Sequence, residues 1–158
     1  MDKVFDEKAP PGAVRLRGRY RAEVYGPDGK LKEAREGNNV VTTVGKEFLA
    51  SYLYSGAAAA STFTAKYAAV GTSTTPEAAA DTAMGTELVR TTGTVSYVSG
   101  AIVQVTATFT TGTAAGQVTE YGLFTSSTGG TLFSRDTEST ITVGASDTLK
   151  VVYQLTLS

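Results

Sequence analysis

The chain of 158 residues contains no cysteine, no histidine and no tryptophan. Without cysteine it has no disulfide framework, no zinc–thiolate site and no thiol nucleophile. Without histidine it lacks the commonest general base and the commonest metal ligand, and it cannot form a Ser-His-Asp or Cys-His catalytic site. These absences exclude most familiar catalytic constellations, so the sequence predicts a protein that is not an enzyme and that uses no cofactor or metal.

Long apolar runs and an excess of one charge are missing as well. No segment approaches the roughly 18–20 apolar residues of a membrane span, and residues 1–8 lack the apolar core of a signal peptide. The 14 Lys and Arg nearly balance the 15 Asp and Glu, whereas a strongly basic balance would indicate nucleic acid or an anionic membrane. We therefore expect a soluble protein made in a cytoplasm, with neither nucleic acid nor a membrane as its partner.

Threonine and glycine, in contrast, are abundant, with 26 and 17 residues. The branched Cβ of threonine suits the pleated surface of a strand, and glycine suits tight turns. This composition predicts a mainly β protein.

The charged residues are unevenly distributed. Residues 1–50 hold 18 of the 29 charges, whereas residues 91–134 hold only Glu120. Edge strands normally carry charges that protect them against pairing with another chain. The uncharged stretch therefore fits a surface that another subunit covers, and the alternative is a sandwich core with a threonine-rich exterior.

The N-terminal part divides into an arm and a hairpin. Residues 1–12 are charged and contain Pro10 and Pro11, which remove two backbone donors, so we expect an extended arm. Residues 13–25 alternate between apolar and charged side chains, which is the pattern of a half-buried strand. The turn sequence Gly26–Gly29 then predicts a hairpin over residues 13–36.

Charge pairs favour one register of this hairpin. Pairing Tyr25 with Lys30 would place Glu23 opposite Lys32 and Arg19 opposite Glu36. Each of these charge pairs would stabilise the hairpin by roughly a few tenths of a kcal/mol.

A change of period then predicts one helix, over about residues 43–54. Val44, Phe48 and Tyr52 recur at a spacing of four, with Leu49 and Leu53 beside them. We expect Thr43 to cap this helix and Gly56 to end it. The small residues Ala57–Ala60 predict a loop.

The remaining sequence predicts short strands separated by turns. Their ranges are 66–70, 87–97 (with Gly93 as the place for a bend), 101–110, 117–125, 131–135, 139–143 and 148–157. Seven or more strands at this spacing indicate a single β-sandwich or jelly-roll domain over residues 13–158.

Four arginines form the strongest local charge signal. Arg15, Arg17, Arg19 and Arg21 project from one face of the first strand at a spacing of about 6.6–6.8 Å. This row fits phosphates or an acidic protein surface. The alternative is a solvated face that Glu23, Glu33 and Glu36 partly neutralise.

Carboxylates and lysines are the other residues that permit chemistry. Two carboxylates can hydrolyse a glycoside, and the candidates are Asp81, Glu87, Glu120, Asp136 and Glu138. A Ser/Lys dyad would use Lys46, Lys66 or Lys150. No motif supports either site, so we expect the carboxylates to form caps, turns or ion pairs.

The order of strands and turns over most of the chain resembles that of a family of small β-rich virion proteins of tailed bacteriophages. The resemblance covers residues 38–158 and rests on Tyr67–Thr72, Pro76, Asp81–Arg90, Glu120–Phe124, Gly130–Asp136 and the final strand Leu149–Leu157. Spacing within these motifs suggests that Asp81 or Glu87 pairs with Arg90 or Arg135 and holds the long loop against the sandwich.

The resemblance implies a structural role in the virion. We expect a capsid decoration protein, a homotrimer that binds the major capsid protein on the outer surface of the shell and that is made in the bacterial cytoplasm. The alternative is a tail or tail-fibre adaptor. The residues expected to contact the partner are Val4, Phe5, Pro10, Pro11, Arg15, Arg17, Arg19 and Arg21.

Overall fold

A computed structural model of the chain describes residues 14–54 and 63–158. The expected arm over residues 1–12, the helix end expected at Gly56 and the loop expected at Ala57–Ala60 lie outside the described residues.

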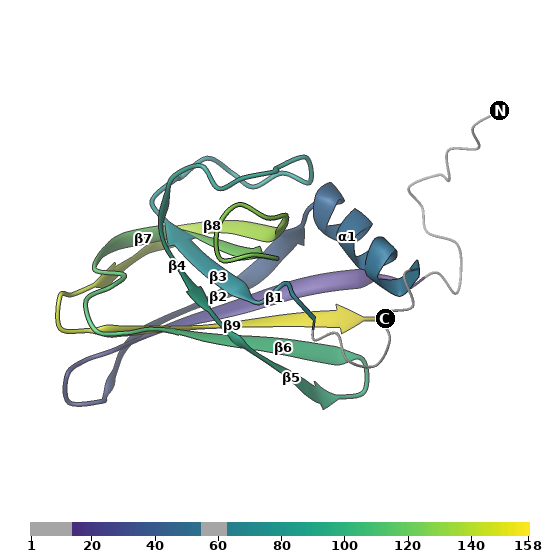
Figure 1. Ribbon diagram of the computed structural model, residues 1–158. Helices are drawn as coiled ribbons and strands as arrows, with labels where there is room; N and C mark the ends of the chain where they lie inside the picture. Colours follow the sequence, from purple (N-terminus) through teal and green to yellow (C-terminus); the bar gives the residue numbers. More distant parts are fainter. Residues whose placement is uncertain (1–13, 55–62) are drawn as a thin grey trace.

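Nine strands and one helix make up the described part of the chain. The strands are β1 (Leu16–Tyr25), β2 (Leu31–Val41), β3 (Tyr67–Gly71), β4 (Glu87–Thr92), β5 (Thr94–Ser99), β6 (Ile102–Phe109), β7 (Gly116–Phe124), β8 (Leu132–Val143) and β9 (Thr148–Leu157), and the helix is α1 (Thr43–Tyr54). The protein is therefore mainly β with one short helix, as the sequence predicts (Figure 1).

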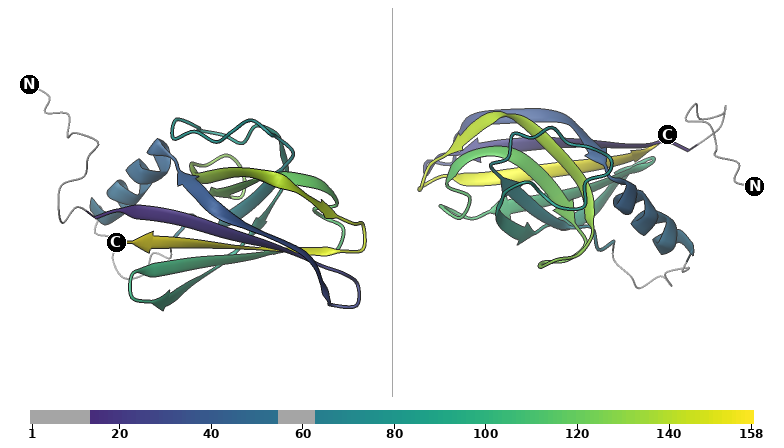
Figure 2. Two further views of the ribbon diagram at one scale, coloured as in Figure 1. Left: turned by 180° about the vertical axis from the view of Figure 1, so that it is seen from behind. Right: turned by 90° about the horizontal axis from the view of Figure 1, so that it is seen from above.

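The strands form one antiparallel sheet that curls back on itself (Figures 1 and 2). Its order is β4-β3-β7-β8-β2-β1-β9-β6-β5. β2 pairs with β1 over most of its length, and its last residues, Val40 and Val41, pair with β8. We call β2, β1, β9, β6 and β5 the five-stranded half and β8, β7, β3 and β4 the four-stranded half. The two halves pack face to face, which gives a sandwich-like arrangement.

The chain crosses between the two halves at Gly93, which joins β4 to β5, the two edges of the sheet. A methyl group on Gly93 would lie 2.7 Å from Val105 Cγ1 and 3.0 Å from the carbonyl oxygen of Lys66. A residue without Cβ is therefore required where the backbone passes so close to its neighbours. The bend expected at Gly93 is confirmed, and it separates two strands.

The hydrophobic core lies between the halves. On β1, Tyr20, Ala22 and Val24 point inward and alternate with exposed arginines. The same period of two places one face of each neighbouring strand in the core. Other buried members are Val70, Val105, Ala107, Phe109, Val118, Tyr121, Leu123, Phe133, Ile141, Leu149, Val151 and Tyr153.

The expected hairpin of β1 and β2 forms, but in a different register. A bulge near the end of β1 shifts the pairing, so that Glu36 lies opposite Arg21 and not opposite Arg19. Lys32 binds Asp147 instead, with 2.6 Å between Nζ and Oδ2. The expected register is wrong because the turn, in which the Gly26 amide donates to the Lys30 carbonyl oxygen, and the bulge set the pairing, and exposed charge pairs contribute too little free energy to change it.

Helix α1 has the expected bounds, but Thr42 caps it, not Thr43. The Thr42 hydroxyl accepts a hydrogen bond from the Gly45 amide at 2.9 Å. Phe48 faces the core, where its ring centroid lies 6.2 Å from that of Phe133. Leu53, expected on the apolar side, is 73% exposed. Within the described residues, no helix has the length and apolar character needed to cross a membrane.

The two short strands expected at 131–135 and 139–143 are a single strand, β8. β8 pairs with β7 on both sides of an irregularity between Val118 and Glu120. The exposed polar residues in the middle of β8 interrupt the apolar pattern of the sequence, which therefore predicts two strands. Their backbone nevertheless remains part of one strand.

Candidate binding surface

The alternation of β1 places a row of arginines on the outer face of the five-stranded half. Arg17, Arg19 and Arg21 are exposed, and the residues between them are buried or partly buried. Arg15 precedes the strand and is also exposed. The row expected from the sequence is therefore present, because successive side chains of a strand point to opposite faces.

Neighbouring strands extend this row into a broader surface. Gln154 of β9 pairs with Arg19 on one side and with Gln104 of β6 on the other. The two amides are linked, with Gln154 Nε2 donating to Gln104 Oε1 at 3.0 Å. We call the surface formed by Arg17, Arg19, Arg21, Glu23, Glu36, Gln104, Thr106, Lys150 and Gln154 the basic face. It contains a shallow depression of about 470 Å³.

The charges of the basic face are only partly compensated. Arg21 Nε lies 2.8 Å from Glu23 Oε1, and Arg21 Nη1 lies 3.2 Å from Glu36 Oε2. Lys150 Nζ lies 3.5 Å from the other oxygen of Glu23. The hydrogen bond from Arg21 lowers the pKa of Glu23, so this carboxylate is ionised at neutral pH. In the described part of the chain, the exposed guanidinium groups of Arg17 and Arg19 have no carboxylate partner.

A second depression continues the basic face toward α1. It has a volume of about 450 Å³, and its lining residues are Arg17, Lys46, Asn38, Asn39, Leu16, Gly18, Val40, Val41 and Ala79. Beyond Arg17 it adds one cation, Lys46, and the amides of Asn38 and Asn39, and its other lining residues carry no charge. The basic face and this depression together offer hydrogen-bond donors to an acidic partner.

Of the residues expected to contact a partner, the structure brings Arg15, Arg17, Arg19 and Arg21 onto β1 and the residues just before it. The other expected residues, Val4, Phe5, Pro10 and Pro11, lie outside the described residues. Gln104, Lys150 and Gln154 were missed, because only the strand order reveals that β9 and β6 lie beside β1.

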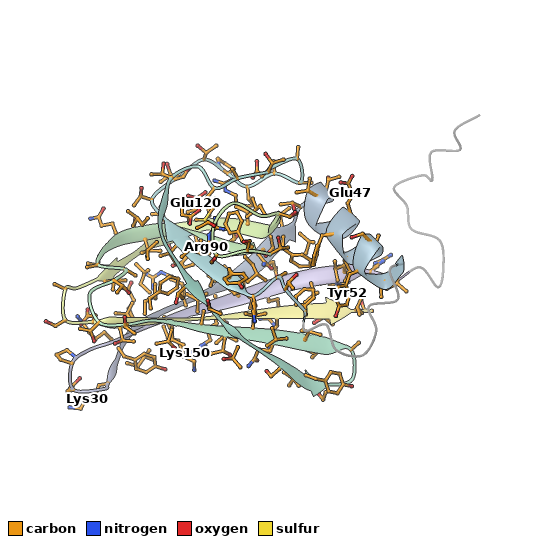
Figure 3. The ribbon with its side chains drawn as sticks, viewed as in Figure 1. Lys30, Glu47, Tyr52, Arg90, Glu120 and Lys150 are labelled. Carbon is orange, nitrogen blue, oxygen red and sulfur yellow. The ribbon has the colours of Figure 1, made fainter. Side chains whose placement is uncertain are left out.

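A buried ion cluster holds the loop over residues 72–86, on the side of the molecule opposite to the basic face. In Figure 3, Glu120 lies beneath this loop at the top of the view, and Lys150 of the basic face lies at the bottom. Arg135 Nη1 lies 2.8 Å from Asp81 Oδ2, and Arg135 Nε lies 2.7 Å from Glu120 Oε1. Glu120 also accepts hydrogen bonds from the amides of Gly85 and Thr86. The expected pairing of Asp81 with Arg135 is confirmed, and so is that of Glu87 with Arg90, at 2.7 Å.

The sequence did not predict that Glu120 belongs to this cluster. It is 0% exposed, and both of its oxygens accept hydrogen bonds. The sequence shows Glu120 as the single charge between residues 91 and 134, but only the fold shows that it is buried, where a carboxylate requires a partner.

Asp136 lies on the inner side of β8, close to Tyr20. A methyl group on Gly37 would lie 3.0 Å from the Tyr20 ring and 3.5 Å from the carboxylates of both Asp136 and Glu138. Burial, and then the negative charge of Glu77, raise the pKa of Asp136 to about 7. Asp136 is only 4% exposed.

These contacts account for the carboxylates considered for glycoside hydrolysis. Asp81 and Glu120 bind one guanidinium group, Glu87 binds another, and Asp136 is buried. The fifth candidate, Glu138, is exposed and accepts a hydrogen bond from the Ser139 amide at 3.0 Å. Within the described residues, no three carboxylate side chains come together so that they could hold a metal ion.

The basic face is thus the described surface best suited to recognition. Neither protein-family models, curated proteins nor solved structures give a significant match to this chain.

Proposed function

We propose that this chain is a structural protein that binds an acidic protein surface through its basic face, as a decoration protein on the outer shell of a bacteriophage capsid. Two arguments support the proposal. The strand and turn motifs resemble those of small phage virion proteins, and the exposed arginines of β1 fit an acidic partner.

The observation that carries the proposal is the pair Arg17 and Arg19, exposed and without carboxylate partners in the described part of the chain. Side chains two residues apart on a strand lie about 6.6–6.8 Å apart, so both can contact one acidic patch. A ligand that binds only the assembled shell stabilises that shell by mass action, and many symmetric copies multiply a modest contact.

Copy number in purified particles is the first test. Quantitative mass spectrometry against the major shell protein should give a ratio near one, which corresponds to a protein that covers the head. A handful of copies per particle would contradict decoration and would instead favour a tail or tail-fibre adaptor.

Charge reversal tests the surface itself. We expect Arg19→Glu to weaken binding to purified shells at least about tenfold at low salt, because a like charge facing an acidic patch costs more than about 1.4 kcal/mol. Lys30→Glu is the matched control, since Lys30 is an exposed cation at the tip of the hairpin, away from the basic face (Figure 3). Equal binding of the two variants to the shells would refute the proposal that the basic face contacts the shell.

A further inference from the structure

The two edges of the curled sheet differ in their protection against pairing with another chain. β4 carries Glu87 and Arg90, and Arg90 also donates to the carbonyl oxygens of Ser126 and Gly129. β5 has the sequence Thr-Val-Ser-Tyr-Val-Ser and carries no charge and no proline. Charged side chains and proline are the usual means of blocking an edge, so β4 is protected in a way that β5 is not.

β5 is also open to solvent. It ends the strand order, so one side of its backbone pairs with β6 and no described strand pairs with the other side. Tyr97 is 71% exposed and Val98 is 47% exposed. Thr94–Tyr97 pair regularly with β6, and the register shifts only after Tyr97. These four residues therefore form a regularly paired, uncharged edge strand whose side chains are exposed except for the partly buried Val95.

We propose that the β5 edge pairs with the β5 edge of a second copy of this chain, in an antiparallel arrangement about a two-fold axis. Residues directly opposite each other in an antiparallel pair point to the same face of the sheet. Val95 and Tyr97 lie on the same face of β5, because they are two residues apart on the strand, and Val95 packs against the core and pairs with the buried Val105. The matching register places Ser96 opposite the second copy's Ser96.

A second copy fits this edge because the edge is complementary to itself. In the proposed register Val95 faces the second copy's Tyr97, and Tyr97 faces its Val95. A β-branched residue opposite an aromatic residue is a stabilising cross-strand pair. A charged strand placed against itself would bring like charges together, whereas residues 91–119 contain no charge at all. The contact is isologous, the type that closes into a dimer.

The absence of cysteine makes a crosslinking test specific. In Ser96→Cys the single thiols of two copies would face each other across the axis, at a spacing that a disulfide spans. We expect mild oxidation to convert this variant into a covalent dimer. Leu88→Cys is the matched control, because Leu88 is exposed on the other edge strand, and it should stay largely uncrosslinked. Equal crosslinking of the two variants would overturn the proposal.

The mass in solution tests the same contact without a crosslink. We expect light scattering to give twice the chain mass of 16.4 kDa for the unmodified protein and for Ser96→Thr. Ser96→Lys should give the single-chain mass, because two ammonium groups would lie opposite each other. Its circular dichroism should be unchanged, since Ser96 is exposed. A single-chain mass for the unmodified protein would overturn the two-fold pairing, and so would a three-chain mass, which would match the trimer expected from the resemblance.

Discussion

Asp136 is a titratable group that folding moves into the core. In the unfolded chain its carboxyl has the ordinary pKa of 3.8, and in the folded protein the pKa is about 7. Between these values the folded state retains a proton that the unfolded state has released. The contribution of Asp136 to stability is therefore fully present below about pH 4 and is lost as the pH rises to about 7.

Asp136→Asn should remove this loss, because the amide is neutral at every pH. We expect the melting temperature of the variant to exceed that of the unmodified protein above pH 7. The gain in the free energy of unfolding is at most about 4 kcal/mol, since one pKa unit corresponds to about 1.4 kcal/mol. The gain should shrink toward pH 4, and thermal melts at several pH values measure it.

Glu47→Gln is the control for Asp136→Asn, because Glu47 is an exposed carboxylate on α1 whose charge does not contribute to the pKa shift of Asp136. It should change stability by less than about 0.5 kcal/mol. If the difference in stability between Asp136→Asn and the unmodified protein were the same at pH 4.5 and pH 8, Asp136 would not be the group that causes the pH dependence of stability.

At the scale of elements, Arg135 on β8 connects the sheet to the loop over residues 72–86. Besides its two carboxylate partners it donates to the carbonyl oxygens of Thr75 and Pro76 at 3.0 and 3.3 Å. Arg135→Ala would leave Glu120 as a buried charge without a cation. We expect it to lower the free energy of unfolding by about 3–5 kcal/mol, as measured by urea denaturation.

Two comparisons make the Arg135 prediction specific. Arg35→Ala should cost no more than about 1 kcal/mol, because the Arg35–Glu33 pair is partly exposed. Adding Glu120→Gln to Arg135→Ala should recover part of the loss, because the amide removes the unpaired charge while its oxygen still accepts a hydrogen bond. An unchanged melting temperature in Arg135→Ala would refute the role of the cluster.

At the scale of the whole molecule, the curled sheet separates the two proposed contact surfaces. The basic face centres on β1 and β9 in the middle of the five-stranded half, and the β5 edge is the outermost strand of that half. Pairing at β5 would therefore extend the five-stranded half across two copies while leaving both sets of arginines uncovered.

This separation predicts independent effects of the two variants. Arg19→Glu should keep the two-chain mass and lose binding to shells, whereas Ser96→Lys should have the single-chain mass and retain the intrinsic affinity of each copy. Light scattering and shell sedimentation on the same samples measure both properties. If one variant abolished both, the two surfaces would have to be parts of a single interface.

Local pattern predicted much of the architecture. The period of two located β1, β6 and β9, the period of four located α1 at its observed bounds, and Gly93 marked the bend. The same alternation placed Arg17, Arg19 and Arg21 on one exposed face. These features depend on residues close together in the chain, where backbone geometry alone decides which side chains share a face.

The chain by itself thus determined the class of fold, most of its elements and the row of arginines on β1. Only the tertiary structure decided that Glu120 would join Arg135, that the pKa of Asp136 would rise, that β9 and β6 would complete the basic face, and that β5 would be left as the open edge. Each of these depends on which distant segments become neighbours. That choice follows from how the whole core closes, because burial is non-directional and does not depend on sequence separation.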